Sequence, residues 1–161
     1  MKVASRRVEF AGYTVNPTTA WMRQIGRNLT DPFDDYLLDV RYLLMDRDTK
    51  FCSEFRDLLE SSGVNCVRLP PRSPNLTPHI ERFMRSIKSE CLERMILFGE
   101  RSLRNAVDAF CEHYHHERNH QGLENRLIDP GEEIGRREGG VVCRERLGGM
   151  LRYYYRRAAC P

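Results

Sequence analysis

The sequence lacks a long apolar run and lacks closely spaced cysteines. Nowhere in its 161 residues do about 18 uncharged apolar residues follow one another, which argues against a membrane span. The opening MKVASRRVEF has no apolar stretch long enough for a signal peptide. The six cysteines form no CxxC pair, which predicts free thiols in a reducing compartment. We therefore expect a cytoplasmic protein with no membrane partner.

Lysine is also scarce. Only three of the 26 basic residues are lysine, and the others are arginine. Guanidinium groups suit phosphate ligands, although a GC-rich coding sequence produces the same bias. The net charge is only +3, but residues 136–161 hold seven arginines and two glutamates. The surplus of positive charge therefore lies at the C-terminal end.

The remaining composition is that of an ordinary globular domain, with 40% apolar and 30% charged residues. Hydrophobic periodicity and breaker residues predict alternating strands and helices. The expected strands cover 8–15, 41–45 and 64–69, and the expected helices cover 18–29, 51–62, 80–97 and 102–116. The Gly- and Arg-rich end predicts a tail, with a short helix around 147–156. This alternation favours the α/β class with a mixed sheet flanked by helices.

Asp46 directly follows the predicted strand over 41–45. A carboxylate at the carboxyl end of a buried strand is a common position for a metal ligand in α/β folds. The Asp-Arg-Asp stretch that begins here is equally typical of a turn. Both interpretations stay open from these residues alone.

Glu81 opens the predicted helix over 80–97. At about 100° per residue, Glu81, Arg85 and Lys88 share one face, while apolar residues fill the other side. A carboxylate followed by cations is what a metal ligand beside a phosphate track requires. An exposed Glu81–Arg85 ion pair would produce the same pattern.

Three stretches together resemble a known family. They are LLMDRDTKF (43–51), LPPRSPNLTPHIERFMRSIKSECLERMI (69–96) and HYHHERNHQGLENRL (113–127). The combination resembles the catalytic core of integrases and insertion-sequence transposases, which are DDE polynucleotidyl transferases with a ribonuclease H-like fold. The resemblance covers residues from about 3 to 130. It predicts a catalytic core over 1–130, followed by an Arg-rich C-terminal tail over 131–161.

The resemblance also implies the chemistry. Asp46 and Glu81 match two catalytic carboxylates of the family, which hold two Mg²⁺ or Mn²⁺ ions for cleaving and joining DNA strands. The expected partners are DNA, as element ends and target, and further copies of the chain. The candidate DNA-binding residues are Arg72, Asn75, Arg82, Arg85 and Lys88.

One departure from the family matters. The family places its first catalytic Asp on a first strand, whereas this sequence resembles the family only from the second strand onward. We therefore expect a sheet without its first strand and a metal site without its first Asp. Such a polypeptide should be inactive or very weak in strand transfer. The alternative function is a DNA-binding remnant of a transposase without catalysis.

Two further patterns allow other interpretations. Four histidines cluster over 113–120 near Cys111, and His116 with His120 could share a zinc ion. The spacing lacks a second ligand pair, so histidines bonded to the backbone or facing solvent explain it as well. Tyr153–Tyr155 lie among arginines, which suits stacking on nucleic acid, although a frayed terminus is the simpler interpretation.

Overall fold

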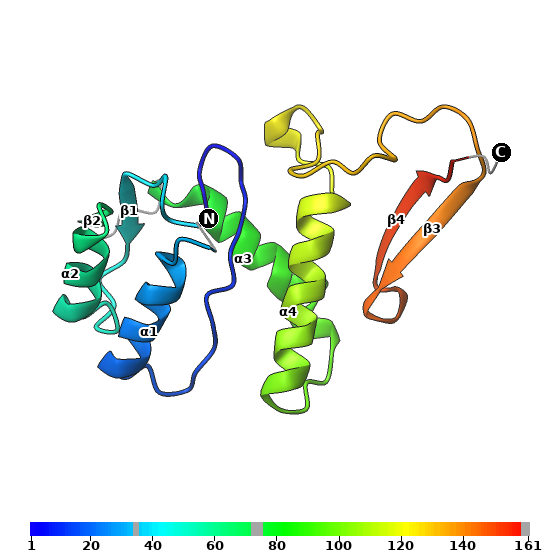
Figure 1. Cartoon of the computed structure of the whole chain (residues 1–161). Coiled ribbons are helices and arrows are strands. Elements are labelled where there is room, and N and C mark those ends of the chain that lie inside the picture. Colours follow the sequence, from blue (N-terminus) through cyan, green and yellow to red (C-terminus); the bar gives the residue numbers. More distant parts are fainter. Residues whose placement is uncertain (34–35, 72–75, 159–161) are drawn as a thin grey trace. The chain divides into compact units, whose positions relative to one another are not determined.

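The computed structural model describes residues 1–33, 36–71 and 76–158 and is drawn in Figure 1. The chain divides into two compact units. One comprises Ala11–Pro78, and the other comprises Met1–Phe10 with His79–Pro161. No described helix is both long enough and apolar enough to cross a membrane.

The unit over Ala11–Pro78 contains a small parallel sheet. Its elements are α1 (Thr19–Leu29), β1 (Tyr42–Met45), α2 (Ser53–Ser61) and β2 (Asn65–Arg68). The two strands pair in parallel, with Tyr42 opposite Asn65 and Met45 opposite Arg68. Parallel strands need a crossover connection, and α2 lies within it. The prediction of strands at 41–45 and 64–69 is confirmed.

The sequence explains how α1 begins and what it packs against. The Thr18 hydroxyl caps the helix by accepting a hydrogen bond from the Trp21 backbone N–H at 3.3 Å. At Gly26, a Cβ atom would lie 2.9 Å from Leu58 Cδ2 of α2. The missing side chain therefore allows the two helices to pack closely. The buried apolar residues of this unit are Met22, Ile25, Leu37, Met45, Phe55, Leu59 and Val64.

The other unit is built on two helices and a hairpin. Its α-helices are α3 (Pro78–Glu90) and α4 (Gly99–His116), and its strands are β3 (Val141–Arg146) and β4 (Leu151–Arg156). Three short 3-10 helices, labelled η, lie between them: η2 (Leu92–Arg94), η3 (Gln121–Leu123) and η4 (Leu147–Gly149). Phe83 of α3 packs edge-on against Phe110 and Tyr114 of α4, with ring centroids 6.0 and 4.9 Å away. Phe110 is fully buried. These aromatic contacts form the packing interface between α3 and α4.

Two predicted elements are wrong. Residues 8–15 form no strand, since the Val8 N–H donates to His115 Nε2 at 3.0 Å rather than to a neighbouring strand. The stretch over 147–156 is not one helix: it forms the short 3-10 turn η4 and the strand β4, which pairs antiparallel with β3. Gly148 and Gly149 turn the chain there at φ angles of 66° and 87°, a region that glycine enters at no steric cost.

The predicted helix over 80–97 is also shorter than expected. It begins at Pro78 and ends at Glu90, and the one-turn η2 follows. The class prediction holds, because the chain is a mixed α/β structure. Its described part contains two separate two-stranded sheets rather than the single larger sheet that was expected. The division into a core over 1–130 and a tail over 131–161 stays a prediction.

Candidate functional site

Asp46 lies where β1 ends, at the carboxyl end of the parallel strand pair. Its side chain is exposed. Its Oδ1 accepts a hydrogen bond from the Asp48 N–H at 3.0 Å, which closes a turn. Asp48 in turn accepts from Lys50 Nζ at 2.7 Å, and this hydrogen bond lowers the pKa of the Asp48 carboxyl. Asp46 therefore stabilises a turn and is also exposed at the carboxyl end of the strand, so both interpretations from the sequence fit its position.

Glu81 lies in the first turn of α3, on the exposed side of the helix. Arg85 and Lys88 are exposed as well, while Phe83 and Ile87 are buried. The predicted separation of charged and apolar faces is therefore present. Asp46 belongs to the unit over Ala11–Pro78, and Glu81 belongs to the other unit. The candidates Arg72 and Asn75 lie outside the described residues.

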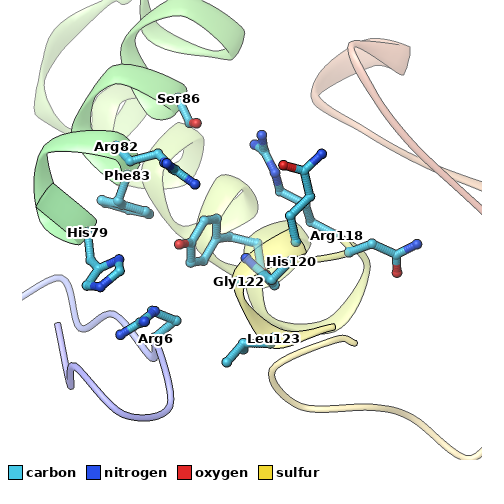
Figure 2. A pocket seen from close by; sticks show the side chains of 12 residues that line it. Arg6, His79, Arg82, Phe83, Ser86, Arg118, His120, Gly122 and Leu123 are labelled. Atoms are coloured by element: carbon cyan, nitrogen blue, oxygen red, sulfur yellow. The ribbon is translucent and has the colours of Figure 1, made fainter. Parts of the chain in front are cut away.

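A pocket opens in the unit that contains α3, with a volume of about 320 Å³. Three of its lining side chains are arginines that come from separate parts of the chain. Arg6 lies in the N-terminal segment, Arg82 near the start of α3, and Arg118 after the end of α4 (Figure 2). The other lining residues are His79, Phe83, Ser86, Tyr114, Asn119, His120, Gln121, Gly122 and Leu123.

The pocket is electropositive. Burial lowers the pKa of His120, and the nearby guanidinium groups of Arg118 and Arg6 lower it further. His79 shows the same direction, since burial and then Arg6 and Arg82 lower its pKa. Both rings are therefore favoured in their neutral form. His120 Nε2–H donates to the Tyr114 carbonyl at 2.8 Å.

The histidines of the cluster have hydrogen-bond partners of their own. His113 Nδ1 bonds Glu117 at 3.0 Å, His115 accepts from Val8, and His116 Nδ1 bonds the Asp129 carbonyl at 2.9 Å. Within residues 1–33, 36–71 and 76–158, no three His, Cys, Asp or Glu side chains are grouped to hold a metal ion. The structure favours histidines bonded to backbone and carboxylate partners.

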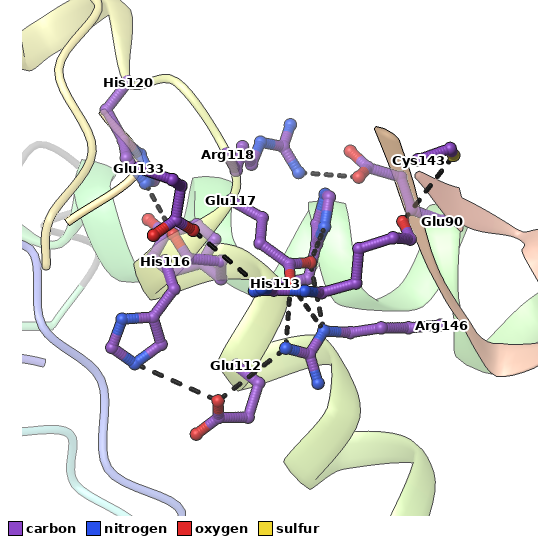
Figure 3. A network of polar contacts seen from close by, with 12 residues as sticks. Glu90, Glu112, His113, His116, Glu117, Arg118, His120, Glu133, Cys143 and Arg146 are labelled. Carbon is purple, nitrogen blue, oxygen red and sulfur yellow. Dashed lines mark hydrogen bonds and ion pairs between the residues drawn. The ribbon is translucent and has the colours of Figure 1, made fainter. Parts of the chain in front are cut away.

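A buried carboxylate joins α4 to the hairpin, as Figure 3 shows. The Glu117 side chain is 0% exposed and accepts from Arg146 Nη2 at 2.8 Å and from Arg144 Nη1 at 3.3 Å. Burial opposes ionisation of this group. The hydrogen bonds from Arg146, His113 and Arg144 outweigh burial, so the pKa of Glu117 lies below its usual value. Two of the C-terminal arginines therefore stabilise the fold.

Reasoning from the sequence missed the pocket and this ion network. Arg6 and Arg118 line the pocket beside Arg82, the one of the three that the sequence singled out as DNA-binding. No local pattern relates Arg6 to Arg82, because they are 76 positions apart. The surplus of arginine after residue 136 was a signal for Arg144 and Arg146, but it did not reveal their buried partner.

Part of the chain matches a known protein family. Residues 62–127 match the family model of the integrase core domain. The match supports the resemblance to the integrase or transposase catalytic core. It covers the stretches over 69–96 and 113–127 but does not reach the stretch over 43–51, which contains Asp46. It points to a polynucleotidyl transferase-like function. No curated protein and no solved structure matches the chain.

Proposed function

We propose that this chain is a core of the integrase-type polynucleotidyl transferases, a ribonuclease H-like family that cleaves and joins DNA strands, and that its own strand transfer is weak because it matches only two of the family's catalytic carboxylates, Asp46 and Glu81. The observation that carries the proposal is the position of Glu81. It lies inside the segment that matches the integrase core domain, on the exposed start of α3. The cations of Arg82, Arg85 and Lys88 follow it along the same exposed part of the helix.

The residues present suit a divalent metal in their chemistry. Asp46 and Glu81 offer hard carboxylate oxygens, which Mg²⁺ prefers, and both side chains are exposed. They would hold Mg²⁺ or Mn²⁺ as two of the ligands that the family uses. When bound, such ions neutralise the charge that develops on the oxygens of a phosphoryl transfer. The protein would contribute the placement of the carboxylates and of the DNA.

The exposed face of α3 would place the DNA. Phosphate contacts position a duplex without reading its sequence, and arginine and lysine supply most of them. Arg82, Arg85 and Lys88 are candidates for these contacts, together with Arg72 and Asn75 in the preceding loop. Element ends and target DNA would be the substrates, and a homo-oligomer would bring two ends together.

The test is metal-dependent strand cleavage by the full chain. Nicked and branched DNA duplexes are incubated with protein and Mg²⁺ or Mn²⁺, and the products are resolved on denaturing gels. We expect the wild type to cleave weakly, and D46N and E81Q each to abolish that cleavage, because each removes a metal ligand. D57N on α2 and E93Q on η2 are matched controls that neutralise exposed carboxylates, and they should cleave as the wild type does. Equal cleavage by E81Q and wild type would contradict the assignment.

DNA binding without cleavage is the second candidate, favoured by the exposed cations of α3. It predicts that the chain binds duplex DNA with a steep dependence on salt and yields no metal-dependent product. In that case R85Q and K88Q weaken binding, while E81Q does not. The same protein preparations distinguish the two functions.

A further inference from the structure

The arginine pocket has a charge arrangement that its own residues do not neutralise. Arg118 has a carboxylate partner, since its Nη1 lies 2.6 Å from Glu90 Oε2. Among the described residues, neither the Arg6 nor the Arg82 side chain has a hydrogen-bond or ion-pair partner. None of the lining residues is an aspartate or glutamate. Two guanidinium groups therefore face a shared cavity without a counter-charge.

Like charges that share a partly enclosed space repel one another, and an anion between them removes that repulsion. The position of Arg6 is held by the backbone, because its N–H donates to the Lys2 carbonyl at 2.9 Å. Arg82 is held by α3, whose inner side is anchored by the buried Phe83. The side chains of all three arginines lie around the cavity, as Figure 2 shows.

The uncharged lining completes an anion site. Ser86, Asn119 and Gln121 bring further groups that can donate hydrogen bonds. The lowered pKa of His120 is consistent with an anion site, because burial and then the positive charges of Arg118 and Arg6 lower it. The volume of about 320 Å³ falls at the lower end of ligand pockets, about 300–1,000 Å³. A phosphate group with part of a nucleotide has a suitable size and charge.

We propose that this pocket binds a phosphate group through Arg6, Arg82 and Arg118, and that a DNA backbone or terminal phosphate is its source. The choice of DNA rests on the proposed function, whereas the anion site stands on the pocket itself. Arginine is suited to the task because its planar fork can bind two phosphate oxygens at once. The pocket would therefore hold one phosphate at a defined point, in addition to the contacts along α3.

The first measurement uses inorganic phosphate with the full chain. Binding is followed by calorimetry and by the shift of the His120 ring resonances. We expect R6Q and R82Q each to weaken phosphate binding at least about tenfold, as the loss of a charge-assisted contact implies. R104Q is the control, because Arg104 on α4 is 53% exposed and pairs with Glu100. It removes the same charge and should leave phosphate binding unchanged.

The second measurement identifies the source of the phosphate. Binding of a duplex and of a 5′-phosphorylated single strand is measured over a range of salt concentrations. If DNA supplies the phosphate, R6Q and R82Q lower the slope of log K against log salt by about 0.7 to 0.9, and inorganic phosphate competes with DNA. Phosphate binding that depends on Arg6 with an unchanged DNA slope would refute DNA as the source and assign the pocket to a small phosphate compound.

Equal phosphate binding by wild type, R6Q and R82Q would overturn the anion site altogether. This failure is distinct from failure of the proposed function, which is read from metal-dependent cleavage by D46N and E81Q. If cleavage depends on Glu81 but phosphate binding does not depend on Arg6, the proposed function is supported and the proposed anion site is refuted.

Discussion

Replacing Glu117 with glutamine should weaken the attachment of the C-terminal hairpin to α4. The wild-type carboxylate is fully buried and accepts hydrogen bonds from His113, Arg144 and Arg146. Removing one partner of a buried ion pair costs about 3–5 kcal/mol, because the other charges remain unpaired. Arg144 and Arg146 are 40% and 23% exposed, so water replaces part of the lost interaction. We therefore expect a loss of about 2–3 kcal/mol.

Hydrogen exchange of the backbone amides measures this loss where it occurs. A cost of about 2–3 kcal/mol corresponds to about 30- to 160-fold faster exchange through local opening. The affected amides are those of β3 and β4, while amides of α1 in the other unit serve as an internal reference. E112Q is the matched control, because Glu112 is 56% exposed and lies 3.9 Å from the same Arg146. An exposed pair of this kind contributes less than about 1 kcal/mol.

The pH dependence gives an independent check. The pKa of Glu117 lies below its ordinary value of 4.5 in the folded chain. Its stabilisation is therefore complete above about pH 4.5 and is lost as the pH falls through the folded pKa. Wild-type protection of the hairpin should decline in that acid range, whereas E117Q should show a flatter profile. Exchange by E117Q within twofold of wild type, or equal to that of E112Q, would refute the role assigned to Glu117.

Three further substitutions test the packing described above. Gly26→Ala should destabilise the unit over Ala11–Pro78 by about 1 kcal/mol in urea unfolding, since the new methyl group would lie 2.9 Å from Leu58 Cδ2 and the overpacking outweighs the higher helix propensity of alanine. Phe110→Ala should cost about 3–5 kcal/mol, because the ring is 0% exposed between α3 and α4. His115→Gln should flatten the loss of stability between pH 7 and 5. Burial lowers the pKa of His115, so its stabilisation is complete above about 6.5 and is lost as the pH falls through the folded pKa.

Each of these substitutions has a control. Gly140→Ala adds the same methyl group where no atom lies within 4 Å, and it should leave the unfolding midpoint unchanged. Phe98→Ala removes a ring that is 81% exposed, and its effect should stay below about 0.5 kcal/mol. For His115→Gln, the control is the wild type measured at the same two pH values, because the prediction concerns the difference in stability between pH 7 and 5. Equal costs for Phe98→Ala and Phe110→Ala would contradict the core assignment.

The helices could be predicted well because their signals are local. Helix hydrogen bonds join residues four apart, so the period of apolar residues and a cap such as Thr18 specify where a helix forms. The predicted helices over 18–29, 51–62 and 102–116 correspond to α1, α2 and α4. The exposed face of α3 follows from the same period.

The strands were less predictable because a strand needs a partner elsewhere in the chain. Val8–Val15 has the composition of a strand, but Val8 bonds His115 and packs into the core around Phe110. The 147–156 segment showed no strand signal strong enough to identify β4. Its pairing with β3 depends on the turn at Gly148 and on the distant anchor at Glu117.

By itself, the sequence determined the α/β class, the apolar and charged faces of the helices, the integrase-like motifs, and the two candidate carboxylates Asp46 and Glu81. These features depend on residues close together in the chain or on short characteristic stretches. Only the tertiary structure decided that Arg6, Arg82 and Arg118 share a pocket, and that Glu117 binds two arginines of the C-terminal hairpin. Charged side chains carry no local mark of their partner, because ion pairs and anion sites form between segments that only folding brings together.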